Sequence, residues 1–393
     1  MAGRSYRRSL GLFALVSLGL GGTVGSGIFV VPGIAAGLLG PVALIAWLLV
    51  GLSAGAVAYA LASVTEGTGD DLLLFQPAEL VFGSVAADLL MATYVASSVF
   101  GCATIGAGLG RYLLFFGVPP DWILPAEIAA VLIFFVVNLA GVALSGAAES
   151  LLTVAKIVPL VVIALLLLPH IQPDHLLDTH TVTLSAFVAA ILVVYWPYSG
   201  FEIGAIPVGE ARDRRTIRTA VLIVASATLT LYLVLNLALI GSAGADALAA
   251  SPAPLAFAAD RILTGGSTVV GVIGIVAMLS ALNAYLLAAS RVLRNLASRR
   301  SLVRVAALSN RGTPGTALLI CSGASAAMLL VTNRFALLAS LAVVLVLAPY
   351  LALSTAVWHT ARARSARVAG AAGALSTGLV LVLSLLTAVR AAG

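Results

Sequence analysis

The strongest constraint on this chain is a series of eleven apolar runs, each about as long as a membrane-spanning helix. Such a helix needs roughly 20 predominantly apolar residues. Clusters of Gly, Pro, Asp or Arg separate the runs, although only residues 145–149 divide the fourth from the fifth. The runs cover residues 10–37, 41–64, 84–115, 122–143, 150–168, 184–208, 217–241, 266–290, 314–332, 335–358 and 368–389. The pattern predicts an all-α integral membrane protein of about 11 transmembrane helices, with residues 1–393 in a single membrane domain.

The composition excludes a water-soluble globule. Apolar residues make up 61% of the chain and charged residues 9%, against about 25% charged residues in an ordinary soluble domain. The net charge of +6 comes from arginines between apolar runs, so we expect no nucleic-acid partner. Cys102 and Cys321 both lie in apolar runs and indicate no disulfide framework. We interpret the first run as a retained span and not as a cleaved signal peptide.

The arginines predict the orientation. If the N-terminus is cytoplasmic, sixteen arginines fall on the inner side and four on the outer side, as the positive-inside rule requires. The inner arginines are Arg4, Arg7, Arg8, Arg212, Arg214, Arg215, Arg218, Arg291, Arg294, Arg299, Arg300, Arg304, Arg311, Arg362, Arg364 and Arg367. We therefore expect a multi-pass protein of the plasma membrane with a cytoplasmic N-terminus. The connection between the second and third runs is also inner, yet it carries only acidic charges.

Two of the runs are interrupted at similar depth. Residues 19–29 contain five glycines, and residues 195–202 contain a proline, a glycine and a carboxylate. Either one alone is equally well explained by close helix packing or a kink. They lie five runs apart, at the same place in two halves of opposite topology, and such paired interruptions indicate a transporter binding site near the midplane.

The interruptions predict what would bind there. Free N–H groups at the start of a half-helix favour an anion, and free carbonyls at the broken ends suit an ammonium group. One site with both describes a zwitterionic amino acid, and glycine lets it approach the backbone. We expect Trp196 and Phe201 to cover the substrate, although lipid or core packing is an alternative for both. The predicted binding residues at the breaks are Thr23, Gly25, Ser26, Gly27, Ile28, Trp196, Ser199, Gly200 and Phe201.

Five short motifs resemble signatures of the amino acid-polyamine-organocation superfamily of transporters, over about residues 10–358. They occur at residues 25–29, 138–142, 152–156, 198–202 with 209–210, and 289–293. The resemblance implies the LeuT-type 5+5 inverted repeat, with repeats at 10–168 and 184–358 and an additional helix at 368–389. It also implies that Tyr285 lines the substrate pocket. Residues 65–72 depart from the family's Pro-x-x-Gly-Gly-x-Tyr pattern, and residues 211–214 replace its usual Asn-Pro.

Two charged residues within the runs are candidates for proton coupling. Lys156 is the only lysine of the chain, and a charge at such depth indicates function. By resemblance it lies where sodium-coupled relatives hold sodium, and a buried lysine can release its proton, so we expect proton coupling. The alternative is a lysine that snorkels to the inner surface. Glu202 either senses a proton or contacts the first break, or it only caps freed N–H groups.

The rival functions find less support in the sequence. A passive channel would repeat one selectivity element around an oligomer axis, and an intramembrane enzyme needs a polar constellation that these residues do not supply. His170, His175 and His180 are five residues apart and would not share a helix face, so we expect no metal. The sequence has no glycine-rich phosphate-binding signature, so we expect no nucleotide, and no cofactor besides the coupling proton. We expect a neutral, apolar amino acid as substrate, because a cationic side chain needs an acidic partner. An exchanger, an exporter or a cationic amino acid and polyamine transporter remain alternatives.

Overall fold

The computed structural model describes residues 10–64, 74–178, 181–206 and 211–392, and the described structure is helical without strands. The long helices are α1 (Leu12–Thr23), α2 (Ser26–Leu39), α3 (Ala43–Val64), α5 (Ser84–Phe115), α6 (Pro120–Leu139), α7 (Val142–Leu167), α9 (Leu184–Tyr198), α10 (Arg214–Ala243), α13 (Gly266–Arg299), α15 (Gly315–Val331), α16 (Phe335–Thr360) and α17 (Arg364–Ala392). The short helices are η1 (Gly40–Val42), α4 (Gln76–Phe82), η2 (Leu168–His170), α8 (Pro173–Leu177), η3 (Phe201–Ala205), α11 (Ala245–Ala250), α12 (Pro254–Asp260) and α14 (Val303–Ala306).

The lengths of these helices match a membrane protein. Nine helical runs in the described ranges are long and apolar enough to cross a bilayer. The first of them, Leu12–Val64, contains α1, α2 and α3, and α15 is a shorter apolar helix of 17 residues. An all-α integral membrane protein is confirmed. The count of eleven spans and the inverted repeat stay predictions.

One predicted boundary was wrong. The sequence placed the division between the fourth and fifth runs at residues 145–149, whereas α6 ends at Leu139 and α7 begins at Val142. The turn is at Gly141, which has a φ of +123°, a conformation that glycine adopts without steric strain. Residues 145–149 therefore belong to α7, and Glu149 lies inside a long helix.

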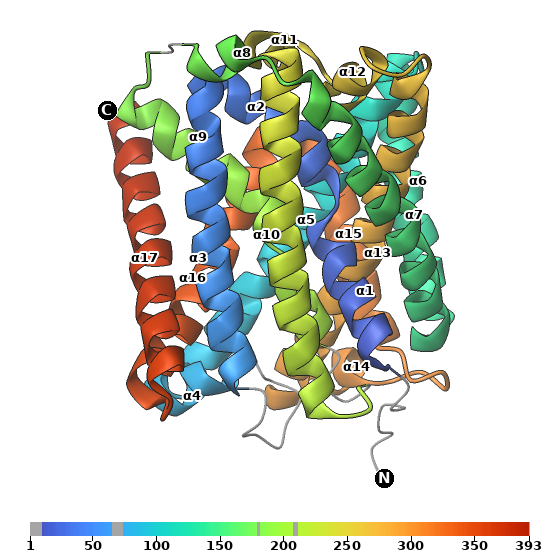
Figure 1. Cartoon of the computed structure of the whole chain (residues 1–393). Helices are drawn as coiled ribbons and strands as arrows, with labels where there is room; N and C mark the ends of the chain where they lie inside the picture. Colours follow the sequence, from blue (N-terminus) through green and yellow to red (C-terminus); the bar gives the residue numbers. More distant parts are fainter. Residues whose placement is uncertain (1–9, 65–73, 179–180, 207–210, 393) are drawn as a thin grey trace.

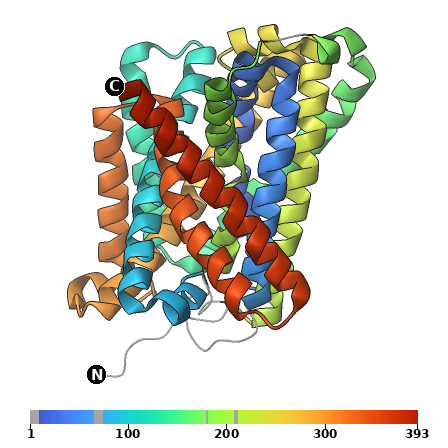
Figure 2. The same cartoon turned by 90° about the vertical axis from the view of Figure 1, so that its left-hand side faces the viewer.

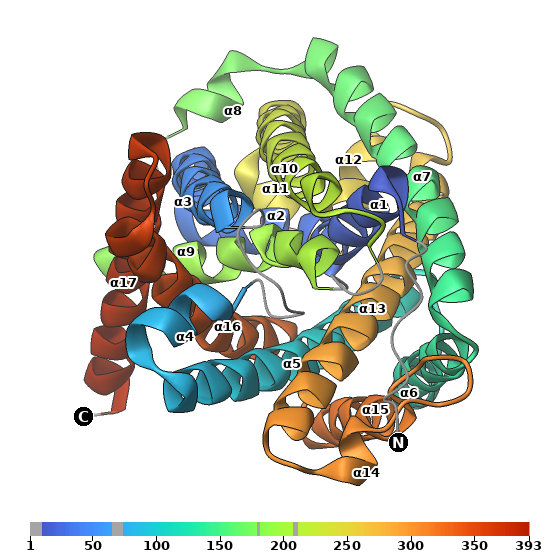
Figure 3. The same cartoon turned by 90° about the horizontal axis from the view of Figure 1, so that it is seen from below.

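The helices form one bundle whose interior contains both interrupted segments. Seen from below, α5 and α13 cross the bundle next to α16, while α17 and α6 lie at opposite margins (Figure 3). Figure 2 shows α17 running obliquely over its neighbours, and it packs on α16 and α3. α4 and α14 mark the lower end in Figure 1, and α8, α11 and α12 mark the upper end.

Some sequence predictions fall outside the described residues. These are the first three arginines, the loop at 65–72 that departs from the family pattern, His180, and the motif at 209–210. Leu10, the first described residue, pairs with the segment that precedes α10. The Arg212 N–H donates to the Leu10 carbonyl over 2.9 Å.

Candidate substrate and coupling site

The first interruption lies between α1 and α2. α1 ends at Thr23, α2 begins at Ser26, and Val24 and Gly25 connect them in non-helical conformations. The N–H groups in the first turn of a helix have no helical partner. In α2 no side chain caps them either. Ser26, Gly27 and Ile28 are buried. The predicted break is confirmed, and it presents backbone donors inside the bundle.

The second interruption lies between α9 and η3. α9 ends at Tyr198, Ser199 is extended, and Gly200 has a φ of +102°, in the left-handed region. A Cβ at Gly200 would lie 2.9 Å from the Gly22 carbonyl carbon. Glycine is thus needed here twice, for its conformation and for the close approach of two backbones. η3, a 3₁₀ helix of five residues, follows the break.

The two interruptions contact each other directly. The Trp196 indole N–H donates to the Ser26 hydroxyl over 3.2 Å. A Cβ at Gly27 would lie 2.6 Å from the Cα of Pro197, and a Cβ at Gly25 would lie 2.5 Å from the Cβ of Ala281. These glycines therefore allow helices to pack closely, which is the alternative that the sequence left open for each break alone.

An aromatic cluster lies beside the breaks. The rings of Trp196 and Tyr285 have centroids 5.6 Å apart, and the Tyr285 hydroxyl lies 3.3 Å from the Ser199 hydroxyl. α5 approaches this pair through Gly101, where a Cβ would lie 2.8 Å from the Tyr285 ring. The structure thus brings together three of the predicted binding residues, and it adds Gly101, which the sequence did not indicate.

The carbonyls at the broken ends already accept hydrogen bonds. The Tyr232 hydroxyl of α10 donates to the Thr23 carbonyl over 2.8 Å, and the Ser199 hydroxyl donates to the Trp196 carbonyl over 2.7 Å. The sequence predicted these two carbonyls to be free, and that was wrong, because Tyr232 reaches the first break from α10 and Ser199 bonds back to Trp196 at the second. Each carbonyl oxygen also accepts from a backbone N–H, Thr23 from Gly25 and Trp196 from Ser199, so both lone pairs of each oxygen are engaged.

Lys156 is enclosed by the helices that surround the first break. Its side chain is fully buried. The ammonium group donates to the Gly21 carbonyl over 2.9 Å and to the Ser280 hydroxyl over 2.7 Å. A snorkelling lysine would direct its ammonium group to the surface, so the structure contradicts that alternative. Lys156 thus links α7 to α1 and α13. Its acceptor on α1, Gly21, lies two residues before that helix ends.

Glu149 lies two helical turns from Lys156 and is also fully buried. One carboxylate oxygen accepts from Ser280 and from Thr153, and the other accepts from the Asn283 amide over 2.9 Å. Sequence reasoning missed this residue, because it treated residues 145–149 as a boundary. The spacing of seven residues from Lys156 was the available signal, since it places both side chains on one helix face.

Glu202 and Phe201 contact residues of α5 and α16. The Glu202 carboxylate accepts from the Tyr94 hydroxyl over 3.0 Å, the Tyr350 hydroxyl over 2.5 Å and the Gly200 N–H over 3.1 Å. The bond to the Gly200 N–H is the capping that the sequence left open, but Glu202 does not only cap, because two tyrosine hydroxyls also bind it. Phe201 packs on Tyr350, with centroids 5.3 Å apart, and not over the Trp196 ring.

The motif resemblance agrees with a comparison of the whole sequence. A model of the amino acid permease family matches residues 10–392. The chain belongs to the amino acid permease family. The resemblance to the amino acid-polyamine-organocation superfamily is thereby confirmed. The permease is a multi-pass membrane transporter of amino acids and not an enzyme.

Relatives cover about three quarters of the permease. It is 27% identical over 314 residues to the inner membrane transport protein YbaT of Escherichia coli, covering 77% of this chain and 72% of that protein. It is 27% identical to the serine/threonine exchanger SteT of Bacillus subtilis, covering 75% and 69%. It is 28% identical to the aromatic amino acid transport protein AroP of Corynebacterium glutamicum, covering 78% and 70%.

Four charged residues join helices at the lower end of the permease. Arg299 of α13 contacts Glu79 of α4 over 2.7 Å and Asp88 of α5 over 2.5 Å. Arg300 contacts Asp88 over 2.7 Å. We call these residues the Arg299 cluster. Glu79, one of the acidic residues between the second and third runs, is therefore a partner of Arg299, which follows the eighth run.

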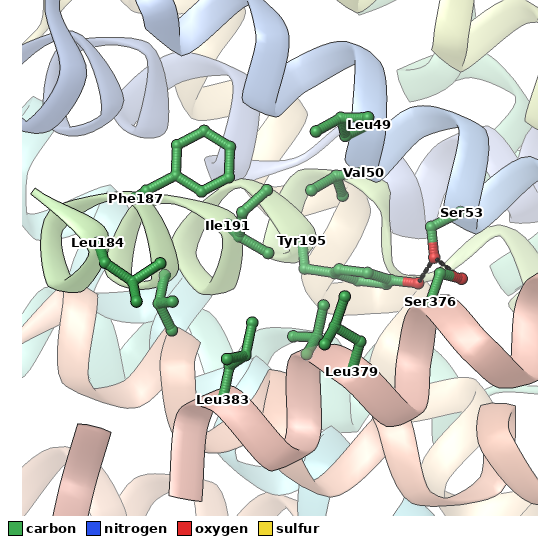
Figure 4. A pocket seen from close by; sticks show the side chains of 12 residues that line it. Leu49, Val50, Ser53, Leu184, Phe187, Ile191, Tyr195, Ser376, Leu379 and Leu383 are labelled. Carbon is green, nitrogen blue, oxygen red and sulfur yellow. Dashed lines mark hydrogen bonds between the residues drawn. The ribbon is translucent and has the colours of Figure 1, made fainter. Parts of the chain in front are cut away.

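An apolar cavity of about 320 Å³ lies between α3, α9 and α17. Its walls are mainly Leu, Ile, Val and Phe side chains, and Figure 4 shows the Tyr195 hydroxyl beside Ser53 and Ser376 at one end. Ser53 lies 2.8 Å from the Tyr195 hydroxyl and donates to Ser376 over 2.7 Å. The cavity is separate from the breaks, although Tyr195 directly precedes Trp196.

Proposed function

We propose that the permease is a secondary active transporter that moves a neutral, apolar amino acid across the plasma membrane by alternating access, coupled to protons. The observation that carries this proposal is the contact between the two interruptions, where Trp196 donates to Ser26. Two breaks that touch inside a membrane bundle offer backbone donors and acceptors that a continuous helix would use internally.

The polar ends of the substrate would bind the broken backbones. The uncapped N-terminus of α2 offers N–H groups at Ser26, Gly27 and Ile28, and these, with the helix dipole, stabilise a carboxylate. The ammonium group would bind the carbonyl at Ser199, or the carbonyls at Thr23 and Trp196 in place of their present donors. Gly25 and Gly200 would keep side chains away from this region.

The surroundings of the breaks favour a neutral substrate side chain. Trp196 and Tyr285 form an aromatic wall. Two carboxylates lie beside the breaks, and each already accepts from three donors: Glu202 and Glu149. A buried cation without a carboxylate partner is strongly disfavoured. The names of two relatives, a serine/threonine exchanger and an aromatic amino acid transport protein, also refer to neutral amino acids.

Lys156 supports proton coupling. Its ammonium group donates to the Gly21 carbonyl, two residues before α1 ends, and is shielded from water. A lysine can exist in a neutral form in such a place, whereas an arginine cannot. A change in the protonation state of Lys156 therefore changes the strength of its hydrogen bond to α1. A proton shifts a two-state equilibrium only by its different affinity for the two states, and a bond at the break supplies such a difference.

Flux in proteoliposomes tests the function. We expect saturable counterflow of radiolabelled neutral amino acids, inhibited by leucine, alanine or methionine, and accumulation under a proton gradient. Inhibition by arginine or putrescine but not by these three would overturn the substrate class. Flux that does not saturate would indicate a channel. Counterflow without proton entry would favour the second candidate, an exchanger, which the similarity to the serine/threonine exchanger supports.

A further inference from the structure

Glu149 and Lys156 lie on one face of α7 with a hydroxyl between them. Seven residues advance a helix by about 700°, almost two full turns, and by about 10.5 Å along its axis. Ser280 of α13 bridges this distance, because its hydroxyl accepts from the Lys156 ammonium group over 2.7 Å and donates to the Glu149 carboxylate. Ammonium, hydroxyl and carboxylate thus form one continuous chain of hydrogen bonds.

A hydroxyl can donate in either direction, so this chain has two arrangements with the same atoms. In the first, Lys156 is an ammonium group, Ser280 donates to Glu149, and Glu149 is a carboxylate. In the second, Ser280 has received a proton from the Lys156 nitrogen and passed its own proton to the Glu149 oxygen. Glu149 is then a neutral carboxylic acid that donates to Ser280, and Ser280 donates to the neutral amine of Lys156.

Charge favours transfer to Glu149 over loss of the proton from Lys156 alone. Both side chains are fully buried, and a single uncompensated charge at such a place is strongly disfavoured. If Lys156 simply released its proton, the Glu149 carboxylate would remain as an unpaired buried anion. Transfer through Ser280 leaves two neutral groups. The pair carries no net charge before or after the step.

Lys156 and Glu149 are each other's charged partner, and the tyrosines of the neighbouring helices form hydrogen bonds elsewhere. In the described residues, α7 packs against α1, α6, α10 and α13, with η2 and α12 towards its upper end. α1 has no ionisable side chain. Tyr232 of α10 donates to Thr23, and Tyr285 of α13 contacts Ser199.

The groups nearest the carboxylate on α6 and α13 are neutral amides. Asn138 of α6 donates to the Asn283 oxygen over 2.9 Å, and Asn283 donates to Glu149. Glu127 of α6 is directed at Gly110 of α5, where a side chain would overlap its carboxylate. No described acid or base other than Lys156 competes for the proton of Glu149.

We propose that Glu149 is the proton acceptor of Lys156 and that transfer through Ser280 weakens the bond of Lys156 to the first break. The Gly21 carbonyl accepts from the ammonium group, and a charged donor binds roughly twice as strongly as a neutral one. A Cβ at Gly21 would overlap the Glu149 carboxylate, so both ends of this chain of hydrogen bonds touch Gly21, two residues before α1 ends. This inference rests on the proposed proton coupling.

The position of Glu149 gives the transfer a direction. α7 ends next to η2 and α8 at the upper end of the molecule (Figure 1). Glu149 therefore lies about two turns closer than Lys156 to the lower end, which carries α4, α14 and the Arg299 cluster. That end is the predicted cytoplasmic end. A proton that passes from Lys156 to Glu149 moves towards the cytoplasm, as uptake driven by an inward proton gradient requires.

The test uses the full chain in liposomes with a pH dye in the lumen, an acidic exterior, and an equimolar mixture of radiolabelled alanine, leucine, serine and phenylalanine. We expect Glu149→Gln to lower amino acid accumulation and coupled lumen acidification roughly a hundredfold, the low end of what a positioned proton-transfer group contributes. Its uptake should no longer rise with external acidity. Glu127→Gln is the matched control, because Glu127 is buried on α6 and outside this chain of hydrogen bonds. It should accumulate substrate like the wild type.

A second pair of variants tests the relay even if Glu149→Gln does not fold. Ser280→Ala removes the bridging hydroxyl and should lose the pH dependence of uptake, whereas Ser280→Thr keeps a hydroxyl and should restore it. Coupled uptake in Glu149→Gln or in Ser280→Ala that equals the wild type would overturn the acceptor role. Wild-type counterflow without any proton entry would overturn the proposed coupling and the acceptor role together. Absence of wild-type flux would overturn the transporter itself.

Discussion

At the scale of single residues, Lys156 is where the proposed proton coupling can be tested. It contacts a backbone carbonyl of α1 and a hydroxyl of α13 in a fully buried space. An arginine at this position carries a permanent charge and cannot release a proton. We expect Lys156→Arg and Lys156→Ala both to lose accumulation under a proton gradient, measured with radiolabelled neutral amino acids in proteoliposomes. Accumulation in Lys156→Arg at the wild-type level would exclude the lysine as proton carrier.

Gly27 offers a second test at this scale. A Cβ at Gly27 would lie 2.6 Å from the Cα of Pro197, which belongs to the backbone and cannot rotate away. Overpacking of this kind costs about 1–3 kcal/mol. We expect Gly27→Ala to lower the thermal unfolding temperature and to reduce transport. Gly55→Ala is the control, because a Cβ there meets nothing within 4 Å. Equal unfolding temperatures of the two variants would show that α2 and α9 are not tightly packed here.

At the scale of helices, the Arg299 cluster joins α4, α5 and α13 at the lower end. Asp88 contacts two arginines, and its side chain is 10% exposed, whereas the side chain of Arg300 is 55% exposed. Removal of one member of a buried pair leaves an uncompensated charge, whereas an exposed pair contributes about 0–1 kcal/mol. We expect Asp88→Asn to lower the thermal unfolding temperature clearly more than Arg300→Gln does.

High salt provides the control for this prediction. Exposed charges are screened over about 8–10 Å at physiological ionic strength and over shorter distances in more salt. The effect of Arg300→Gln should therefore disappear first as salt is raised. Asp88→Asn weakens both contacts of Asp88, whereas Arg300→Gln removes only one. If both variants lower the unfolding temperature equally, the contact between Asp88 and Arg299 adds no stability.

At the scale of the whole molecule, the arginine distribution predicts which end faces the cytoplasm. The chain suits a labelling experiment, because Cys102 and Cys321 are both buried. Leu177 of α8 and Val303 of α14 are highly exposed at opposite ends. We expect a membrane-impermeant maleimide to label Leu177→Cys in intact cells. Val303→Cys should be labelled only after the membrane is made permeable. The reverse pattern would contradict the predicted orientation.

The sequence by itself determined the features that depend on local composition. The length of each apolar run predicts a spanning helix wherever it lies, and a cluster of glycines weakens a helix without reference to neighbours. The breaks near Gly25 and Gly200 and the position of Lys156 within an apolar run could therefore be predicted from the sequence alone. Only the tertiary structure decided which residues these positions face. Glu149 and Ser280 are 131 residues apart in the chain, and Tyr232 and Thr23 are 209 apart. Such contacts depend on how each helix is rotated and tilted against the others, because in a uniformly apolar helix no polar face indicates that rotation.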